Sequence, residues 1–204
     1  MTSSLDAILL CGGKGVRLRP LTESLPKPLV PIKGKPILGH ILNHLSNSPI
    51  KHYYIAAGFE INKIHEYFSI NPLKEKKVTI VDSGEVEIIE RIVSCAKLIK
   101  SDGFLVLYGD TLADINIKKL LQFHSKHNGL ATIVLWPMRS PFGVMEIGEQ
   151  DRVESYLEKP VLNKWINIGF FYFSSKLIPK MESFEKFEAF IEYLVNKQEL
   201  YAFK

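Results

Sequence analysis

Short apolar segments that alternate with amphipathic segments constrain the fold of this 204-residue chain more than any other feature. The apolar segments have the length of buried strands, and they are residues 7–10, 53–57, 78–81, 104–108, 132–135 and 168–173. Segments with apolar residues at helical spacing are residues 36–45, 61–68, 88–98, 117–127 and 184–194. Alternation of strands with helices predicts an α/β sandwich. A ligand is then expected outside the carboxyl ends of the strands.

A glycine-rich segment follows the first apolar run and reads C-G-G-K-G-V-R-L-R-P from Cys11. Glycine lets backbone N–H groups approach a ligand closely, so Gly12, Gly13 and Gly15 can line a concave site for phosphate oxygens. The cations of the same stretch are Arg17, Arg19 and Lys27. Arginine can hold phosphate through two hydrogen bonds at once. The segment therefore predicts a polyphosphate site, and a solvated surface turn is the alternative.

The spacing of these glycines, G-G-x-G-x-R, differs from two common phosphate-binding motifs. It lacks the third glycine of the dinucleotide fingerprint and the G-K-[ST] ending of a P-loop. Hydride transfer and ATP hydrolysis are therefore disfavoured.

Composition indicates one soluble domain over residues 1–204, with 46% hydrophobic and 24% charged residues. The net charge is only +4 and no long basic tract occurs, which disfavours nucleic-acid binding. Cys11 and Cys95 lack C-x-x-C spacing and indicate a reducing compartment. No apolar run is long enough to span a membrane, and no signal peptide is evident. A cytoplasmic protein is expected.

A candidate metal ligand, Asp110, follows the apolar run 104–108 through a glycine. Its carboxylate is expected at the carboxyl edge of the sheet, beside the glycine segment, where it could bind Mg²⁺ together with phosphate oxygens. Capping of the turn or of a following helix is the local alternative. Asp114 is expected to cap a helix that starts near Ile115. His124 and His127 have a metal-like spacing but no strong accompanying ligand, so surface histidines are expected.

The motifs from Ala7 to Ile37 resemble the signature of the sugar-1-phosphate nucleotidyltransferases. The similarity continues in V-D-S-G (81–84), L-Y-G-D-T-L-A-D-I-N-I (107–117), F-G-V (142–144), E-K-P (158–160) and I-N-I-G-F-F (166–171). The resemblance implies a three-layer Rossmann-like sandwich with a mixed, mostly parallel sheet. It also implies a nucleotide-binding half at about 1–115 and an acceptor-binding half at about 116–204.

The resemblance further implies the roles of individual residues. The residues expected to bind the nucleotide are Leu10, Gly12, Gly13, Gly15, Arg17 and Gly84. Arg17 and Lys27 are expected to be catalytic and Asp110 to hold Mg²⁺. Lys159 is expected to meet the acceptor phosphate, and the residues of the sugar pocket are Glu158, Asn167 and Gly169. Locally, a Glu-Lys pair is equally typical of a solvated surface, and a strand glycine of a bulge.

The expected reaction is attack by the phosphate of a sugar 1-phosphate on the α-phosphorus of a nucleoside triphosphate, giving a nucleotide sugar for surface polysaccharide synthesis and pyrophosphate. CTP is favoured because the V-D-S-G and Y-G-D-x-x-A-D motifs are most similar to the glucose-1-phosphate cytidylyltransferases. Guanylyl or uridylyl transfer to a heptose or amino-sugar 1-phosphate is the alternative. An inactive nucleotide-binding relative that acts as a regulator or partner subunit is another.

Two departures from the family pattern bear on these expectations. Residues 85–90 read E-V-E-I-I-E where the family has a glycine pair near the base, so the identity of the base stays open. The sequence ends at Lys204, before the strand that carries a second metal-binding Asp and the helices used in dimerisation in similar proteins. A homo-oligomer is therefore left open.

Overall fold

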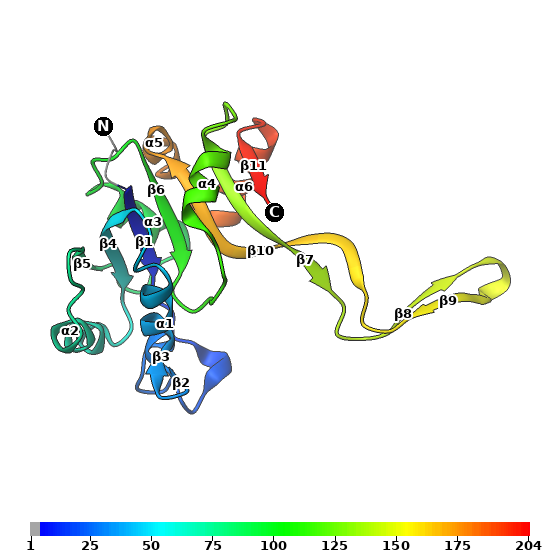
Figure 1. The fold of residues 1–204 in the computed structure, drawn as a ribbon, viewed down its shortest axis with the longest axis horizontal. Coiled ribbons are helices and arrows are strands. Elements are labelled where there is room, and N and C mark those ends of the chain that lie inside the picture. Colours follow the sequence, from blue (N-terminus) through cyan, green and yellow to red (C-terminus); the bar gives the residue numbers. More distant parts are fainter. Residues whose placement is uncertain (1–4) are drawn as a thin grey trace.

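A seven-stranded sheet forms the centre of the computed structural model, which describes residues 5–204 (Figure 1). The strands run in the order β11 (Leu200–Phe203), β7 (Ala131–Arg139), β10 (Val161–Ser174), β6 (Gly103–Tyr108), β1 (Leu5–Leu10), β4 (Ile50–Ala57) and β5 (Lys77–Asp82). The pairs β6–β1, β1–β4, β4–β5 and β11–β7 are parallel, whereas β10 is antiparallel to both neighbours. The predicted mixed, mostly parallel sheet is confirmed.

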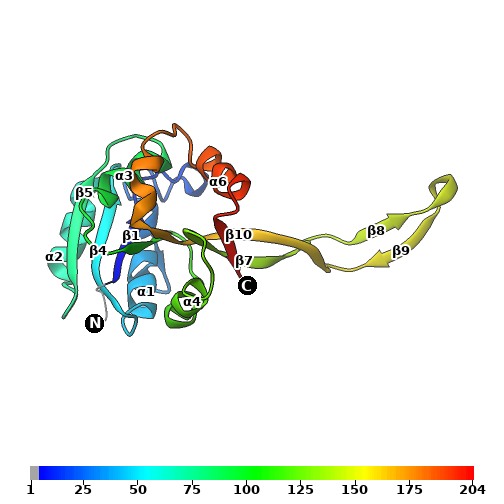
Figure 2. The ribbon, with the colours of Figure 1, turned by 90° about the horizontal axis from the view of Figure 1, so that it is seen from above.

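Helices cover both faces of this sheet, so the fold has three layers (Figure 2). One face packs against α1 (Ile37–His44), α2 (Ile61–Ile70) and α4 (Ile117–His124). The other packs against α3 (Ile88–Ala96), α5 (Ile178–Met181) and α6 (Phe187–Asn196). Strand β1 shows why both faces are apolar, since Ala7 and Leu9 enter the first core and Ile8 enters the second. Successive side chains of a strand point to opposite faces, and both faces here are buried.

A long two-stranded arm leaves the body of the molecule (Figures 1 and 2). We call residues 136–166 the arm, because there β7 and β10 pair with each other alone. Beyond them the hairpin of β8 (Val144–Ile147) and β9 (Val153–Leu157) forms its end. A second small hairpin, β2 (Pro31–Ile32) with β3 (Lys35–Pro36), precedes α1. The predicted strand 168–173 is thus only the inner part of β10, because its outer part is exposed and lacks the apolar signal of a buried strand.

Several local expectations are wrong or only partly met. Aromatic residues are expected in the core, and Tyr53, Tyr54, Phe170 and Phe171 are buried there, whereas Trp136, Phe142, Tyr156 and Trp165 are exposed on the arm. Asp114 does not cap α4. Asn116 does so instead, because its side-chain oxygen accepts a hydrogen bond from the Lys119 amide at 3.0 Å. Strand β11 was not among the predicted strands. None of the helices in residues 5–204 combines the length and apolar character needed to cross a bilayer.

The histidines expected at the surface, His124 and His127, are partly buried. His124 Nδ1 and His127 Nε2 both lie 2.9 Å from the Thr132 hydroxyl, on the buried strand β7. His127 stacks on Tyr201 of β11 with 3.9 Å between ring centroids. Burial lowers the pKa of His124 to about 4, and the neighbouring His127 adds to that effect. The pair therefore serves as neutral packing between α4, β7 and β11.

Candidate functional site

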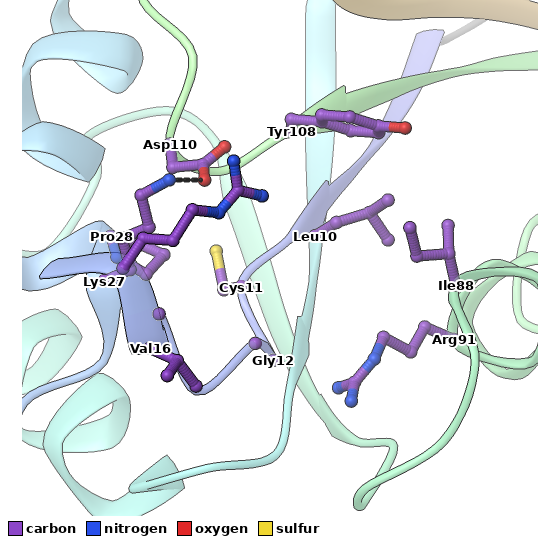
Figure 3. A pocket seen from close by; sticks show the side chains of 13 residues that line it. Leu10, Cys11, Gly12, Val16, Lys27, Pro28, Ile88, Arg91, Tyr108 and Asp110 are labelled. Carbon is purple, nitrogen blue, oxygen red and sulfur yellow. Dashed lines mark ion pairs between the residues drawn. The ribbon is translucent and has the colours of Figure 1, made fainter. Parts of the chain in front are cut away.

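A pocket of about 460 Å³ opens at the carboxyl ends of β1 and β6 (Figure 3). Seven residues singled out from the sequence line it: Leu10, Gly12, Gly13, Gly15, Arg17, Lys27 and Asp110. They come from three separate segments, namely the end of β1 with the loop and 3₁₀ turn that follow it, the short helix at Lys27–Leu29 and the turn after β6. The carboxyl edge of the sheet brings these segments together, as expected for an α/β fold. Their individual roles stay predictions.

The loop after β1 uses its glycines for different physical reasons. Gly15 has a φ of +60°, a left-handed conformation that glycine adopts without penalty. Its carbonyl accepts a hydrogen bond of 2.8 Å from the buried Thr22 hydroxyl, which fixes the turn into the 3₁₀ helix Val16–Leu18. Around Gly13 an added Cβ would meet no atom within 4 Å, so its backbone is open to a ligand. The loop is thus anchored at Gly15 and accessible at Gly13.

An ion pair joins two of the predicted functional side chains. Lys27 Nζ lies 2.5 Å from Asp110 Oδ2, and the two side chains are 34% and 29% exposed. Lys27 is held by the short helix whose next residues, Pro28 and Leu29, are buried. Asp110 follows Gly109, where an added Cβ would lie 2.7 Å from Cys11 Sγ. The pocket therefore holds one cation and one carboxylate in contact, with Arg17 as a further cation on its wall.

A divalent metal is implied by the family resemblance, so the donor set matters. Within residues 5–204 no three His, Cys, Asp or Glu side chains are grouped closely enough to hold a metal by themselves. Asp110 nevertheless offers a partly exposed carboxylate on the pocket wall. Mg²⁺ usually takes one or two carboxylates and completes its shell with phosphate oxygens and water. The residues present fit such a metal only in the company of a phosphate ligand.

Cys11 is unsuited to act as a nucleophile despite its place on the pocket wall. Burial raises the pKa of its thiol well above the ordinary range, and the nearby Asp110 carboxylate adds to the effect. The thiolate is the reactive form of cysteine, so a thiol held neutral is inert. Cys95 is likewise buried and free.

The structure adds a pocket residue that the sequence did not single out, Arg91 of α3. Its guanidinium points towards Gly12 (Figure 3), and an added Cβ at Gly12 would lie 1.6 Å from its Nη1. The Nε atom donates to the Val86 carbonyl at 3.1 Å and Nη1 to the Ser83 hydroxyl at 3.1 Å. Arg91 is 8% exposed, and burial lowers its pKa. The sequence carries a signal for Arg91, because this arginine lies on the apolar stripe of α3. An arginine is almost never fully buried without a partner, so an arginine at such a position indicates a specific contact.

The acidic side chains of the run 85–90 do not line the pocket. Ile88 and Arg91 line the pocket, whereas Glu85, Glu87 and Glu90 do not. Glu85 instead pairs with Lys14 of the glycine loop at 2.8 Å, and both side chains are largely exposed. An exposed pair contributes little stability, but it links the loop after β1 to the segment before α3.

The remaining predicted residues lie outside the pocket lining. Gly84, with φ +65°, follows β5, and its carbonyl would be 2.4 Å from a Cβ added at Gly58. Gly169, with φ +78°, packs on the ring of the pocket residue Tyr108, and Asn167 Oδ1 accepts a 2.8 Å hydrogen bond from its amide.

Glu158 and Lys159 lie on the arm. They pair with each other at 3.8 Å, and their side chains are exposed. Tyr156 also donates a hydrogen bond to Glu158. In this conformation Glu158 and Lys159 do not reach the pocket, so their predicted contacts with the acceptor stay predictions.

Comparison with known proteins bears on the family. Residues 6–201 match the sequence profile of the family described as Nucleotidyl transferase. The bifunctional protein GlmU of Methanococcus maripaludis is 36% identical over 185 residues, which cover 88% of this chain and 42% of that protein. A probable glucose-1-phosphate cytidylyltransferase of Bacillus subtilis is 32% identical over 194 residues, which cover 85% of this chain and 76% of that protein.

Among solved structures, HddC from Yersinia pseudotuberculosis shares the fold, with a TM-score of 0.76 and 24% identity, over 98% of this chain and 89% of that one. The present chain spans less than half of the GlmU relative. The profile match nevertheless covers nearly the whole chain, including the glycine loop and Asp110. The chain therefore belongs to the nucleotidyl transferase family, as its motifs predicted.

Proposed function

We propose that this chain transfers a nucleotidyl group from a nucleoside triphosphate to a sugar 1-phosphate, giving a nucleotide sugar and pyrophosphate. The observation that carries the proposal is the meeting of the glycine loop, Arg17, Lys27 and Asp110 in one pocket. This set offers open backbone amides, two cations and one hard oxygen ligand. Such groups suit a polyphosphate and do not by themselves suit an uncharged ligand.

The proposed chemistry needs no protein nucleophile, because a phosphate acceptor is already ionised near neutral pH. The neutral thiol of Cys11 agrees with this. Catalysis then consists of positioning and charge neutralisation. Arg17 stabilises the charge that develops on the departing pyrophosphate. Lys27 holds the α-phosphate or the attacking phosphate. To do so it gives up part of its contact with Asp110.

The Asp110 carboxylate would hold Mg²⁺, which neutralises phosphate charge when bound with the nucleotide. Asp110 would be free to hold the ion once Lys27 has moved from it to the phosphate. A metal-dependent gain in nucleotide affinity that is lost in Asp110→Asn would support this role. An unchanged metal dependence in that variant would contradict it.

CTP and glucose 1-phosphate are the favoured substrates, supported by the V-D-S-G and Y-G-D-x-x-A-D motifs and by the similarity to the Bacillus subtilis protein. GTP or UTP with a heptose or amino-sugar 1-phosphate is the second choice. Arg91 offers only hydrogen-bond donors on the pocket wall, so it suits base edges rich in acceptors. We propose that the product serves polysaccharide synthesis in the cytoplasm. Residues 1–115 would bind the nucleotide and residues 116–204 the acceptor.

Pyrophosphate release tests the proposal. The chain is mixed with each of the four ribonucleoside triphosphates, Mg²⁺ and a panel of sugar 1-phosphates, which also identifies base and sugar. We expect Arg17→Ala to lower turnover by roughly two to three orders of magnitude, as when one preorganised charge-stabilising donor is removed. Arg19→Ala is the matched control, since Arg19 is exposed and does not line the pocket. Nucleotide binding without pyrophosphate release in any mixture would contradict an enzyme and favour a binding protein.

A further inference from the structure

The arm exposes apolar side chains that no other part of the fold covers. Eleven large apolar side chains between residues 136 and 166 are exposed, among them Trp136 at 60% and Phe142 at 75%. The arm has only two strands, and an isolated two-stranded ribbon is marginally stable in water unless a third strand or a helix covers it. A concentration of exposed apolar side chains of this kind marks an interaction surface.

One face of the hairpin at the end of the arm is wholly apolar. Ile147 is paired with Val153 and Met145 with Tyr156, so these four side chains point to the same side. Each of them is more than half exposed. The opposite face is mixed: it carries Glu146 and Ser155, which are paired and joined by a hydrogen bond of 3.1 Å, and beside them the apolar pair Val144 and Leu157. The larger uncovered apolar surface of the hairpin therefore lies on the side of Met145, Ile147, Val153 and Tyr156.

Charge is distributed unevenly along the arm. Around its tip, residues 145–156, the acidic side chains are Glu146, Glu149, Asp151 and Glu154, and they face one base, Arg152. In the parts nearer the body the bases are Arg139, Lys159 and Lys164, with one acid, Glu158. Lys204 adds a further cation there, since its Nζ lies 4.7 Å from the centre of the Trp165 ring. The arm thus has an acidic tip and a basic root.

We propose that the arm is a dimerisation element and that a second copy of this chain covers its apolar face. In a two-fold symmetric pair the same surface serves both copies. If the two arms run antiparallel, the acidic tip of each meets the basic root of the other, while the faces of Met145, Ile147, Val153 and Tyr156 are covered. Parallel arms would instead bring two acidic tips together, which costs free energy. The proposal does not depend on the proposed activity.

Analytical ultracentrifugation of the full chain over a wide concentration range tests this proposal. We expect a dimer whose dissociation constant rises about a hundredfold or more in Ile147→Gln/Val153→Gln, because two apolar side chains are lost from each copy. The matched control is Val144→Gln/Leu157→Gln, an uncharged cross-strand pair on the other face, which should leave the dissociation constant nearly unchanged. Far-ultraviolet circular dichroism and the thermal midpoint check that both variants keep the fold.

Salt separates the two arrangements of the arms. Tip-to-root contacts are attractive, so added salt should raise the dissociation constant of the wild type. A fall in the dissociation constant with salt would overturn the antiparallel arrangement. A wild-type monomer at all concentrations would overturn the proposal as a whole and leave the arm to be covered by another segment or another protein. Equal weakening by both double variants would overturn the assignment of the apolar face.

Discussion

Replacing Gly12 by alanine tests the packing beneath the candidate site. A Cβ at this position would lie 1.6 Å from Nη1 and 2.6 Å from Cζ of Arg91, so the guanidinium has to move. Arg91 would then lose its hydrogen bonds to the Val86 carbonyl and the Ser83 hydroxyl. Overpacking of a filled site costs about 1–3 kcal/mol. We expect Gly12→Ala to lower the free energy of unfolding by about 2 kcal/mol, measured by urea denaturation.

A neighbouring glycine and a second variant make this test specific. Gly13→Ala should change the free energy of unfolding by no more than about 0.5 kcal/mol, since a Cβ there meets no atom within 4 Å. In an Arg91→Ala background the clash is gone, and the nearest remaining contact of the new Cβ is the Ala57 carbonyl carbon at 3.4 Å. The cost of Gly12→Ala should then fall below about 1 kcal/mol. An equal cost in both backgrounds would refute the role of Arg91.

The remaining predictions concern the two cysteines, His124 and two glycines with positive φ. Because burial raises the pKa of Cys11 well above its usual range and that of Cys95 to about 12, a thiol reagent at mildly alkaline pH should label both only after denaturation; rapid labelling of native Cys11 would count against its burial. Burial lowers the pKa of His124 to about 4, so the unfolded chain, with a pKa of about 6.5, binds the proton more readily. The stability associated with neutral His124 is therefore present above pH 6.5 and lost as the pH falls towards 4; this loss, about 1–2 kcal/mol after allowance for partial exposure, should shrink in His124→Gln, and an unchanged pH profile would speak against it. Gly169→Ala introduces both a φ of +78° and a Cβ 2.6 Å from the Tyr108 ring, whereas Gly34→Ala introduces only a φ of +79° in open space. Thermal unfolding should show the larger loss for Gly169→Ala, and equal losses would contradict the contact with Tyr108.

Sequence reasoning located the candidate site where its signals were local. Glycines after a buried strand, nearby cations and a carboxylate after another strand all follow from the rule that ligands bind at the carboxyl edge of an α/β sheet. Arg91 was not predicted as a pocket residue, because its place on the pocket wall depends on how α3 packs against the loop after β1. The spacing of apolar residues does not report that packing. The outer part of β10 was not predicted as a strand, because it is exposed and lies outside the central sheet. Asp114 was expected to be the cap because the helix was expected to start near Ile115, whereas α4 begins two residues later, at Ile117, after Asn116.

Heavy oxygen in the acceptor tests nucleotidyl transfer most directly. A sugar 1-phosphate labelled in its phosphate oxygens is incubated with Mg²⁺ and the nucleoside triphosphate that gives pyrophosphate, and the products are analysed by mass spectrometry. If the acceptor phosphate attacks the α-phosphorus, the nucleotide sugar retains all of the label and the pyrophosphate carries none. Labelled pyrophosphate, or a nucleoside monophosphate as the only nucleotide product, would contradict the proposed reaction.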